Sequence, residues 1–150
     1  MTAPPPRAVR ADELGPPENY ALVEHDPGPP SPTQVSISIR AAGISFVDVL
    51  TAGGGYQVKP PVPFIPGSEC AGVVTAVGGD VSGLAVGDQV VGSGWGGMFA
   101  EAVNLPARTV RKMPAALSFA EAAVFPVSYA TAWHALVDRA KLQAGETLLV

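Results

Sequence analysis

Glycine and proline recur at short intervals along this sequence, and their spacing limits its possible folds more than any other feature. The 150 residues include 17 Gly and 16 Pro, which lie between apolar runs rather than in one low-complexity block. Both residues favour turns and interrupt helices, so they leave little length for regular elements. The sequence therefore predicts many short strands joined by turns.

Alternating apolar residues identify the strands. In residues 35–39, Val, Ile and Ile occupy every second position, which places them on one face of a half-buried strand. The proline-rich residues before Tyr20 are expected to be frayed. Strands at roughly ten-residue spacing are typical of a sandwich or a partly open barrel. Further strands are expected at residues 20–24, 71–77, 89–92, 99–105 and 109–113.

Helical spacing appears first in residues 46–52. These residues are followed by Gly53-Gly54-Gly55, which is expected to end the helix. Later in the chain, Ser118 and Glu121 form a capping-box pattern that predicts the start of a second short helix. Pro126 is expected to end or kink that helix.

The last thirty residues differ in character from the rest. Residues 128–140 place apolar side chains at i, i+3, i+4 and i+7, which predicts a helix with one buried face. Gly145 then breaks the helix, and residues 148–150 have the pattern of a buried strand. Because the neighbouring strands are missing, we expect these residues to be frayed, paired with a partner chain or folded back on the preceding helix. This order predicts a mainly β domain in residues 1–118, followed in residues 119–150 by connecting helices and the first strand of a truncated α/β domain.

Composition excludes several classes of function. The net charge is −4, and the chain has no Lys/Arg run of the kind that binds nucleic acid or anionic membranes. The N-terminus lacks the apolar segment of a signal peptide, and no stretch is apolar enough to span a bilayer. A single cysteine, Cys70, cannot form an internal disulfide. We therefore expect no nucleic-acid or membrane partner and a cytoplasmic location.

One glycine motif matches the dinucleotide fingerprint G-x-G-x-x-G in form only. It spans residues 92–97, Gly-Ser-Gly-Trp-Gly-Gly. A diphosphate loop needs a helix directly after it and an acidic residue about 20 positions later. Residues 98–105 instead have the pattern of a strand, so we expect a glycine-rich turn between strands.

Several motifs in register resemble one family. They are Arg40-Ala41-Ala42-Gly43-Ile44-Ser45-Phe46-Val47-Asp48-Val49-Leu50, Gly55-Tyr56, residues 63–72 (PFIPGSECAG), residues 73–78, Gly87-Asp88-Gln89-Val90, residues 97–101 and residues 129–133. Together they resemble the N-terminal part of the zinc-independent NADPH:quinone oxidoreductases, which include zeta-crystallin, within the medium-chain dehydrogenase/reductase superfamily. The resemblance implies a GroES-like, partly open β-barrel followed by a Rossmann domain that binds NADPH. The glycine-rich loop of that domain would follow residues 148–150.

The resemblance also bears on metal binding. Zinc-dependent members of the superfamily carry Cys, His and a third ligand where this chain has Ser45, Ser68 and Val127. Hydroxyl groups and a valine do not replace thiolate and imidazole in a tetrahedral zinc site. His25 and His134 are isolated in the sequence. We therefore expect no metal site.

Candidate site residues follow from the same resemblance. Tyr56 is expected to bond the oxygen of the acceptor or, equally, to pack its loop. Ser45 stands where relatives usually have Asn, and Asp48 is expected to organise its loop rather than to transfer a proton. Ser45, Val127 and Thr131 are the expected contacts to the cofactor. Thr131 is alternatively a hydroxyl that bonds back to its own helix.

These features predict a metal-free enzyme that transfers hydride from NADPH to a quinone or an α,β-unsaturated carbonyl. Ser45, Ser68 and Ser128 lack a nearby His/Asp pattern, so we do not expect a hydrolase. Full-length relatives usually form homodimers through the cofactor domain, and this chain is not expected to use that interface. The alternative is a GroES-like module that binds or assembles without catalysis.

Overall fold

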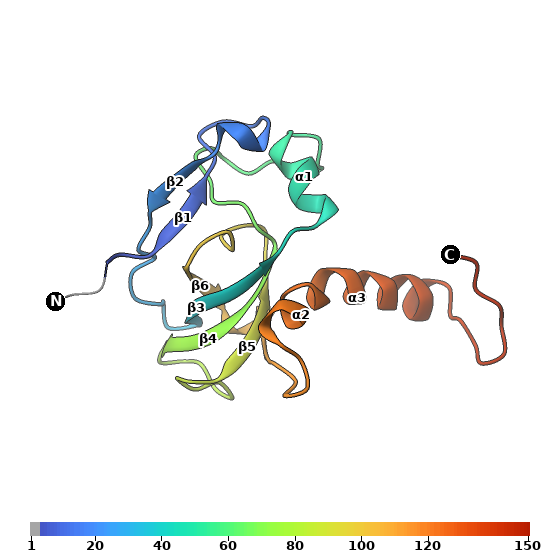
Figure 1. Cartoon of the computed structure of the whole chain (residues 1–150). Coiled ribbons are helices and arrows are strands. Elements are labelled where there is room, and N and C mark those ends of the chain that lie inside the picture. The colour runs from blue at the N-terminus through green and yellow to red at the C-terminus, as the bar shows by residue number, and fades with distance from the viewer. Residues whose placement is uncertain (1–3) are drawn as a thin grey trace.

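The computed structural model describes residues 4–150, and its main feature is one curled antiparallel sheet with a hairpin beside it (Figure 1). The strands are β1 (Arg7–Arg10), β2 (Ala21–Glu24), β3 (Gln34–Gly43), β4 (Glu69–Val77), β5 (Gln89–Ser93), β6 (Ala102–Pro106) and β7 (Val110–Lys112). The α-helices are α1 (Phe46–Ala52), α2 (Phe119–Ala123) and α3 (Phe125–Trp133), with 3-10 turns at Pro17–Asn19 and Ala107–Thr109 and a π-helical segment at His134–Arg139.

The main sheet has the strand order β6-β3-β4-β5-β7. Its edge strands β6 and β7 follow each other in the chain through a single 3-10 turn. The pairing of β3 with β4 shifts register after Ser36 and again after Ile39, and such bulges bend a strand. The sheet therefore curls almost onto itself without a β6–β7 ladder, which confirms the prediction of a mainly β, partly open barrel.

The core lies inside this curl. Alternate residues of β3 point inward and meet apolar side chains from each of its neighbours, as the period-two pattern predicted. This cluster consists of Val35, Ile37, Cys70, Val74, Val90, Met98, Val103, Leu105 and Val110. A smaller cluster joins Ala122 and Ala123 of α2 to Ala71 of β4, so α2 packs directly on the sheet.

Several sequence predictions match the observed elements. The helix at 46–52 has the predicted bounds, and strands occur where they were expected at 35–39, 71–77 and 89–92. The glycine-rich segment 92–97 leads from β5 into a loop and not into a helix, as predicted. The strand expected at 99–105 is shorter and begins only at Ala102. Phe99 instead forms its backbone hydrogen bonds outside the β3–β6 ladder. Its N–H donates to Pro66 O, and its carbonyl accepts from Val9 N–H.

The expectation of a frayed proline-rich lead is wrong for the residues that the structure describes. β1 pairs with β2 in an antiparallel hairpin, and Arg7 pairs with Glu101 at 2.7 Å. Val9 and Ala11 donate backbone hydrogen bonds to Phe99 O and Phe64 O. These partners are distant in sequence, so the local proline pattern contained no sign of them.

The two C-terminal helices differ in part from the predictions. Ser118 and Glu121 form the predicted capping contacts at α2. The helix ends at Ala123, before Pro126, which lies in the first turn of α3, where a missing N–H costs little. α3 begins at Phe125 rather than at residue 128, and α-helical geometry ends at Trp133.

The predicted buried face of this helix is not buried. Tyr129 and Trp133 are both more than half exposed, and α3 extends away from the sheet as an arm (Figure 1). Residues 148–150 form no strand, and Leu149 is 96% exposed. A strand needs hydrogen-bond partners, and residues 148–150 pair with none of the strands of the two sheets. The strand pattern of residues 148–150 is therefore not realised in this structure, and their unpaired, exposed state agrees with the expectation for a strand that lacks its neighbours.

Candidate functional site

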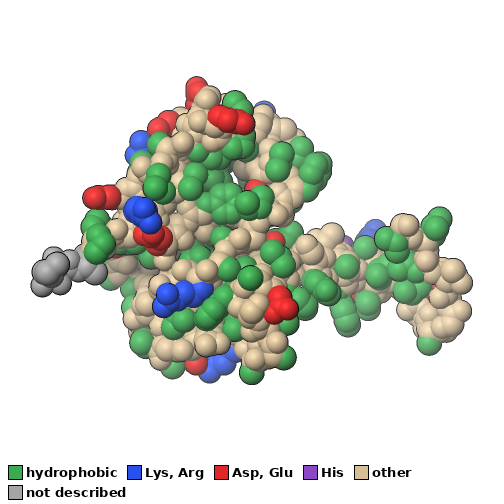
Figure 2. Space-filling model, in the orientation of Figure 1, with side chains coloured by type: hydrophobic (Ala, Val, Ile, Leu, Met, Phe, Trp, Pro, Cys, Tyr) green, Lys and Arg blue, Asp and Glu red, His purple; other side chains and the backbone are tan. Residues whose placement is uncertain are grey.

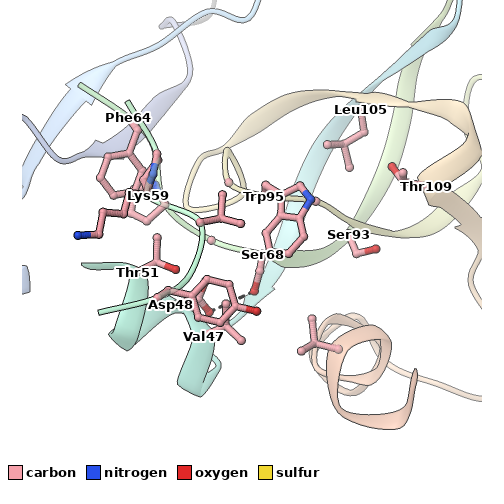
Figure 3. Close-up of a pocket in the computed structure, with 18 of the residues that line it drawn as sticks. Val47, Asp48, Thr51, Lys59, Phe64, Ser68, Ser93, Trp95, Leu105 and Thr109 are labelled. Carbon is pink, nitrogen blue, oxygen red and sulfur yellow. Dashed lines mark hydrogen bonds between the residues drawn. The ribbon is translucent and has the colours of Figure 1, made fainter. Parts of the chain in front are cut away.

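A cleft of about 850 Å³ opens between α1, the loop that follows it, the turn after β5 and the start of α3 (Figure 3). A cleft of this size accommodates a small organic molecule. It contains four of the five predicted site residues, Asp48, Tyr56, Val127 and Thr131. The fifth, Ser45, lies against Asp48 at the edge of the cleft.

Asp48 accepts hydrogen bonds from both serines of the predicted metal-free site. Its Oδ2 accepts from the backbone N–H of Ser45 at 2.7 Å, from Ser45 Oγ at 2.9 Å and from Ser68 Oγ at 3.3 Å. The two hydroxyl oxygens are 3.4 Å apart. Hydroxyls that donate to a carboxylate retain lone pairs, so this cluster is suited to accept a hydrogen bond from a ligand.

Local sequence explains why these groups meet. Ser45 is the N-cap residue of α1 in an extended conformation, and Asp48 is the third residue of that helix, so its carboxylate turns back to the Ser45 N–H. Ser68 is the residue directly before β4. Gly67 beside it has φ +98°, and a Cβ there would lie 2.6 Å from Phe99 N. Only glycine allows this path, which places the Ser68 side chain at Asp48.

Tyr56 and Trp95 line the same cleft from two different loops. Their ring centroids are 6.2 Å apart and the rings are tilted by 39°. Trp95 is 73% exposed, although tryptophan is usually much more buried. Sequence reasoning treated residues 92–97 only as a turn and missed Trp95. The available signal was a large aromatic residue held between glycines.

Glu69 is a second residue that sequence reasoning did not assign to the site. It is only 2% exposed, and its Oε2 accepts a hydrogen bond from Val127 N at 2.9 Å. Val127 is in the first turn of α3, so the carboxylate lies at the positive end of that helix. Burial raises the pKa of Glu69, the Val127 hydrogen bond opposes this, and the nearby charge of Asp48 raises it further. The sequence signal was an acidic residue within an apolar strand.

Thr131 and Val127 are joined within α3. Thr131 Oγ donates to Val127 O at 2.7 Å, which is the back-bonded arrangement that was one of the two alternatives for Thr131. The hydroxyl oxygen still has a lone pair for a donor in the cleft. The side of α3 that lines the cleft therefore offers one apolar side chain and one acceptor.

Residues 31–115 match the family model of the alcohol dehydrogenase GroES-like domain. The chain belongs to this family. Within it, quinone oxidoreductase-like protein 2 homolog of Nematostella vectensis is 43% identical over 148 residues, which is 96% of this chain and 40% of that protein. The GroES-like chain thus spans about 40% of the length of that relative.

Solved structures agree with the family assignment. The crystal structure of the human synaptic vesicle membrane protein VAT-1 homolog-like protein is 33% identical with a TM-score of 0.88, covering 92% of this chain and 44% of that one. CurK enoyl reductase is 31% identical with a TM-score of 0.84, over 94% and 45%. Escherichia coli quinone oxidoreductase complexed with NADPH is 30% identical with a TM-score of 0.78, over 87% and 40%. The shared fold is the GroES-like barrel of medium-chain dehydrogenases and reductases.

The donor atoms of this GroES-like domain do not suit zinc. Ser45 and Ser68 present neutral hydroxyls, and Val127 presents an aliphatic side chain. Within residues 4–150, no three His, Cys, Asp or Glu side chains are grouped closely enough to hold a metal ion.

Over the same residues, none of the helices has the length and apolar character that a membrane span requires.

Proposed function

We propose that this domain binds the electron acceptor in a metal-free oxidoreductase that transfers hydride from NADPH to a quinone or an α,β-unsaturated carbonyl. One observation carries the proposal: two serine hydroxyls at the cleft and its edge are both bonded to Asp48. The family resemblance places these serines where metal-dependent relatives have zinc ligands. Without a Lewis acid, the acceptor must already be electrophilic, and both proposed classes are.

The residues of the cleft have different proposed roles in the reaction. Hydride addition to a conjugated carbonyl leaves negative charge on its oxygen, which a positioned donor stabilises. The Ser45 and Ser68 protons are directed at Asp48, so these hydroxyls are poor candidates for that donor. Tyr56 also lines the cleft and has a phenolic O–H. We assign Tyr56 as the donor to the acceptor oxygen and Asp48 as the residue that positions both serines.

The residues present are compatible with the nicotinamide end of the cofactor. Val127 offers an apolar contact, and Thr131 and Ser45 offer hydroxyl oxygens that accept hydrogen bonds. When bound, NADPH supplies the hydride. The domain contributes orientation, because a correctly held pair of reactants accounts for a large part of an enzymatic rate. The NADPH complex of the Escherichia coli relative supports this choice of cofactor.

The test is an NADPH oxidation assay on the longest natural polypeptide that contains this chain. With 1,4-naphthoquinone or 2-cyclohexenone as acceptor, we expect NADPH consumption in the absence of metal and in the presence of chelator. Tyr56→Phe should lower kcat about tenfold to a hundredfold, because it removes one donor to the developing charge. Tyr129→Phe is the matched control, since Tyr129 lies on the exposed arm. Equal rates for the two variants would contradict the role of Tyr56.

A binding or assembly module without catalysis is the second candidate. It is favoured by the apolar side chains that stay exposed along α3. The two functions differ in what the reading frame encodes after Val150. A glycine-rich loop and βα repeats would support the enzyme, whereas a stop codon would support the module.

Location and assembly are further parts of the proposal. The single cysteine is buried and unpaired among residues 4–150, which is compatible with a reducing cytoplasm. A homodimer formed through a cofactor-binding domain would not involve the cleft described above.

A further inference from the structure

We propose that Trp95 and Tyr56 form a two-walled aromatic clamp that selects flat, conjugated molecules for the cleft. The inference rests on the proposed function, because it takes the occupant of the cleft to be an electron acceptor. It goes further by assigning a role to Trp95 and by naming the shape of acceptor that the site prefers, a fused aromatic quinone over a non-aromatic enone.

The turn that carries Trp95 is fixed at both ends. Gly94 N–H donates to Ser68 O at 3.0 Å, and Gly97 N–H donates to Ile65 O at 2.7 Å. Gly96 has φ +140°, and a Cβ there would lie 2.9 Å from Ile65 O. The backbone on either side of Trp95 is therefore held against the segment that supplies Ser68, and glycine is needed to hold it there.

The indole itself contributes little to the fold. It is 73% exposed, and neither of the two core clusters found in residues 4–150 includes it. Trp95 and Ser68 both line the cleft (Figure 3). A large aromatic side chain that is fixed at its backbone but exposed at its ring is suited to contact a ligand.

The spacing of the two rings favours a thin occupant. Their 6.2 Å centroid separation lies within the range for aromatic rings in contact. A flat molecule stacked between two rings needs about 3.5 Å on each side, or about 7 Å in total. The rings must therefore separate by only about 1 Å and lose their tilt. A puckered enone ring is thicker and offers a smaller π face than a fused aromatic quinone, so it gains less from this arrangement.

The experiment measures binding to the 150-residue chain by calorimetry, without any cofactor. The probes are 1,4-naphthoquinone and 2-cyclohexenone. The only cysteine does not complicate the quinone titration, because Cys70 is buried and burial raises the pKa of its thiol to about 12. The unreactive thiol keeps addition to the quinone from being counted as binding.

We expect Trp95→Ala to weaken naphthoquinone binding about tenfold, which corresponds to about 1.4 kcal/mol. Trp95→Phe retains a stacking face and should restore affinity to within about threefold of the original chain. Binding of 2-cyclohexenone should change less than twofold in either variant. Trp133→Ala is the matched control: Trp133 is 64% exposed on α3 and does not line the cleft.

The clamp is overturned if Trp95→Ala and Trp133→Ala have the same effect, if both probes lose affinity equally, or if the original chain does not bind naphthoquinone. Failure of the proposed function looks different. In that case naphthoquinone binds and Trp95→Ala weakens it, but the longest natural polypeptide shows no NADPH-dependent reduction. Reduction with no effect of Trp95→Ala on binding would support the function and reject the clamp.

Discussion

Glu69 shows how one side chain can couple the stability of this domain to pH. Its carboxyl group is almost fully buried, and burial is the main cause of its raised pKa. A carboxyl whose pKa is higher in the folded state binds protons more tightly there than in the unfolded chain. Its favourable contribution is therefore complete below the unfolded pKa and is lost as pH rises through the folded pKa.

Glu69→Gln should remove this pH dependence. The amide oxygen can still accept from Val127 N–H, but the side chain no longer ionises. We expect the variant to match the original chain near pH 4 and to be the more stable of the two at pH 8, as measured by urea unfolding. A variant that is less stable at pH 8 would mean that the ionised carboxylate at the start of α3 outweighs the cost of burying it.

Glu101→Gln is the control with the opposite sign. Glu101 is exposed, and its pKa is lowered mainly by the hydrogen bond from the Arg7 side chain. Its contribution is present above the unfolded pKa and is lost as pH falls through the folded one. Glu101→Gln should therefore lower stability at pH 8 and leave it unchanged at low pH. If the stability differences between each variant and the original chain change with pH in opposite directions, the effect of burial at Glu69 is distinguished from the effect of ion pairing at Glu101.

At the scale of elements, one glycine determines how closely α2 approaches the sheet. A Cβ on Gly43 at the end of β3 would lie 2.7 Å from Glu69 Oε1 and 2.8 Å from the backbone oxygen of Ala123. The first neighbour is a buried side chain and the second is helix backbone, so neither can move freely. Gly43→Ala should destabilise the domain by about 1–3 kcal/mol in urea unfolding.

Gly79→Ala is the matched substitution. A Cβ there meets nothing within 4 Å, and Gly79 is not among the residues with positive φ. Because alanine restricts the unfolded chain, this variant should be neutral or up to about 1 kcal/mol more stable. If Gly43→Ala is equally harmless, the contact between α2 and the β3–β4 pair is looser than these distances indicate.

Elements specified by nearby residues were predictable from sequence. The bounds of α1 follow from helical spacing that begins after Ser45 and ends at a glycine run. Capping at Ser118 was predictable for the same reason. β1 was not, because its partners β2 and Glu101 lie outside any local window. For α3, periodicity indicated an apolar face but did not indicate what would cover it.

At the scale of the whole molecule, the site could be predicted as a set of residues but not as a geometry. Ser45, Asp48 and Ser68 were identified through family motifs, yet their shared hydrogen bonds at Asp48 Oδ2 depend on the fold. Trp95 and Glu69 were missed. The spacing of the Trp95 ring from Tyr56 and the contact of Glu69 with α3 depend on the fold, and neither is encoded within a short stretch of sequence.

A run of exposed apolar side chains follows the C-terminal arm of the molecule. Phe125 and Tyr129 stack at 4.2 Å, and Trp133 and Val137 follow along the arm formed by α3 and the π-helical segment. Figure 2 shows hydrophobic side chains along this arm, beyond the body of the barrel. The arm begins at Phe125, and its residues Val127 and Thr131 line the cleft, so it starts at the cleft and leads away from it. Only the first turns of α3 can therefore contribute to binding in the cleft.

This arrangement predicts how the 150-residue chain binds nucleotides. Val127, Thr131 and Ser45 suit the nicotinamide end, while the one formal dinucleotide motif, residues 92–97, leads into a loop and not into a helix. Without a helix N-terminus after the glycines, the diphosphate gains neither aligned amides nor a dipole. We expect NADPH to bind this chain with a Kd weaker than about 1 mM by calorimetry.

Reduced nicotinamide mononucleotide makes the NADPH test specific. It contains the nicotinamide end but lacks the adenosine part and the diphosphate bridge. If the chain contacts only the nicotinamide end, the two ligands should bind with Kd values within about threefold of each other, less than 1 kcal/mol apart. Micromolar binding of NADPH, or a large preference for it, would place a diphosphate site within these residues and contradict the prediction that this chain contacts only the nicotinamide end.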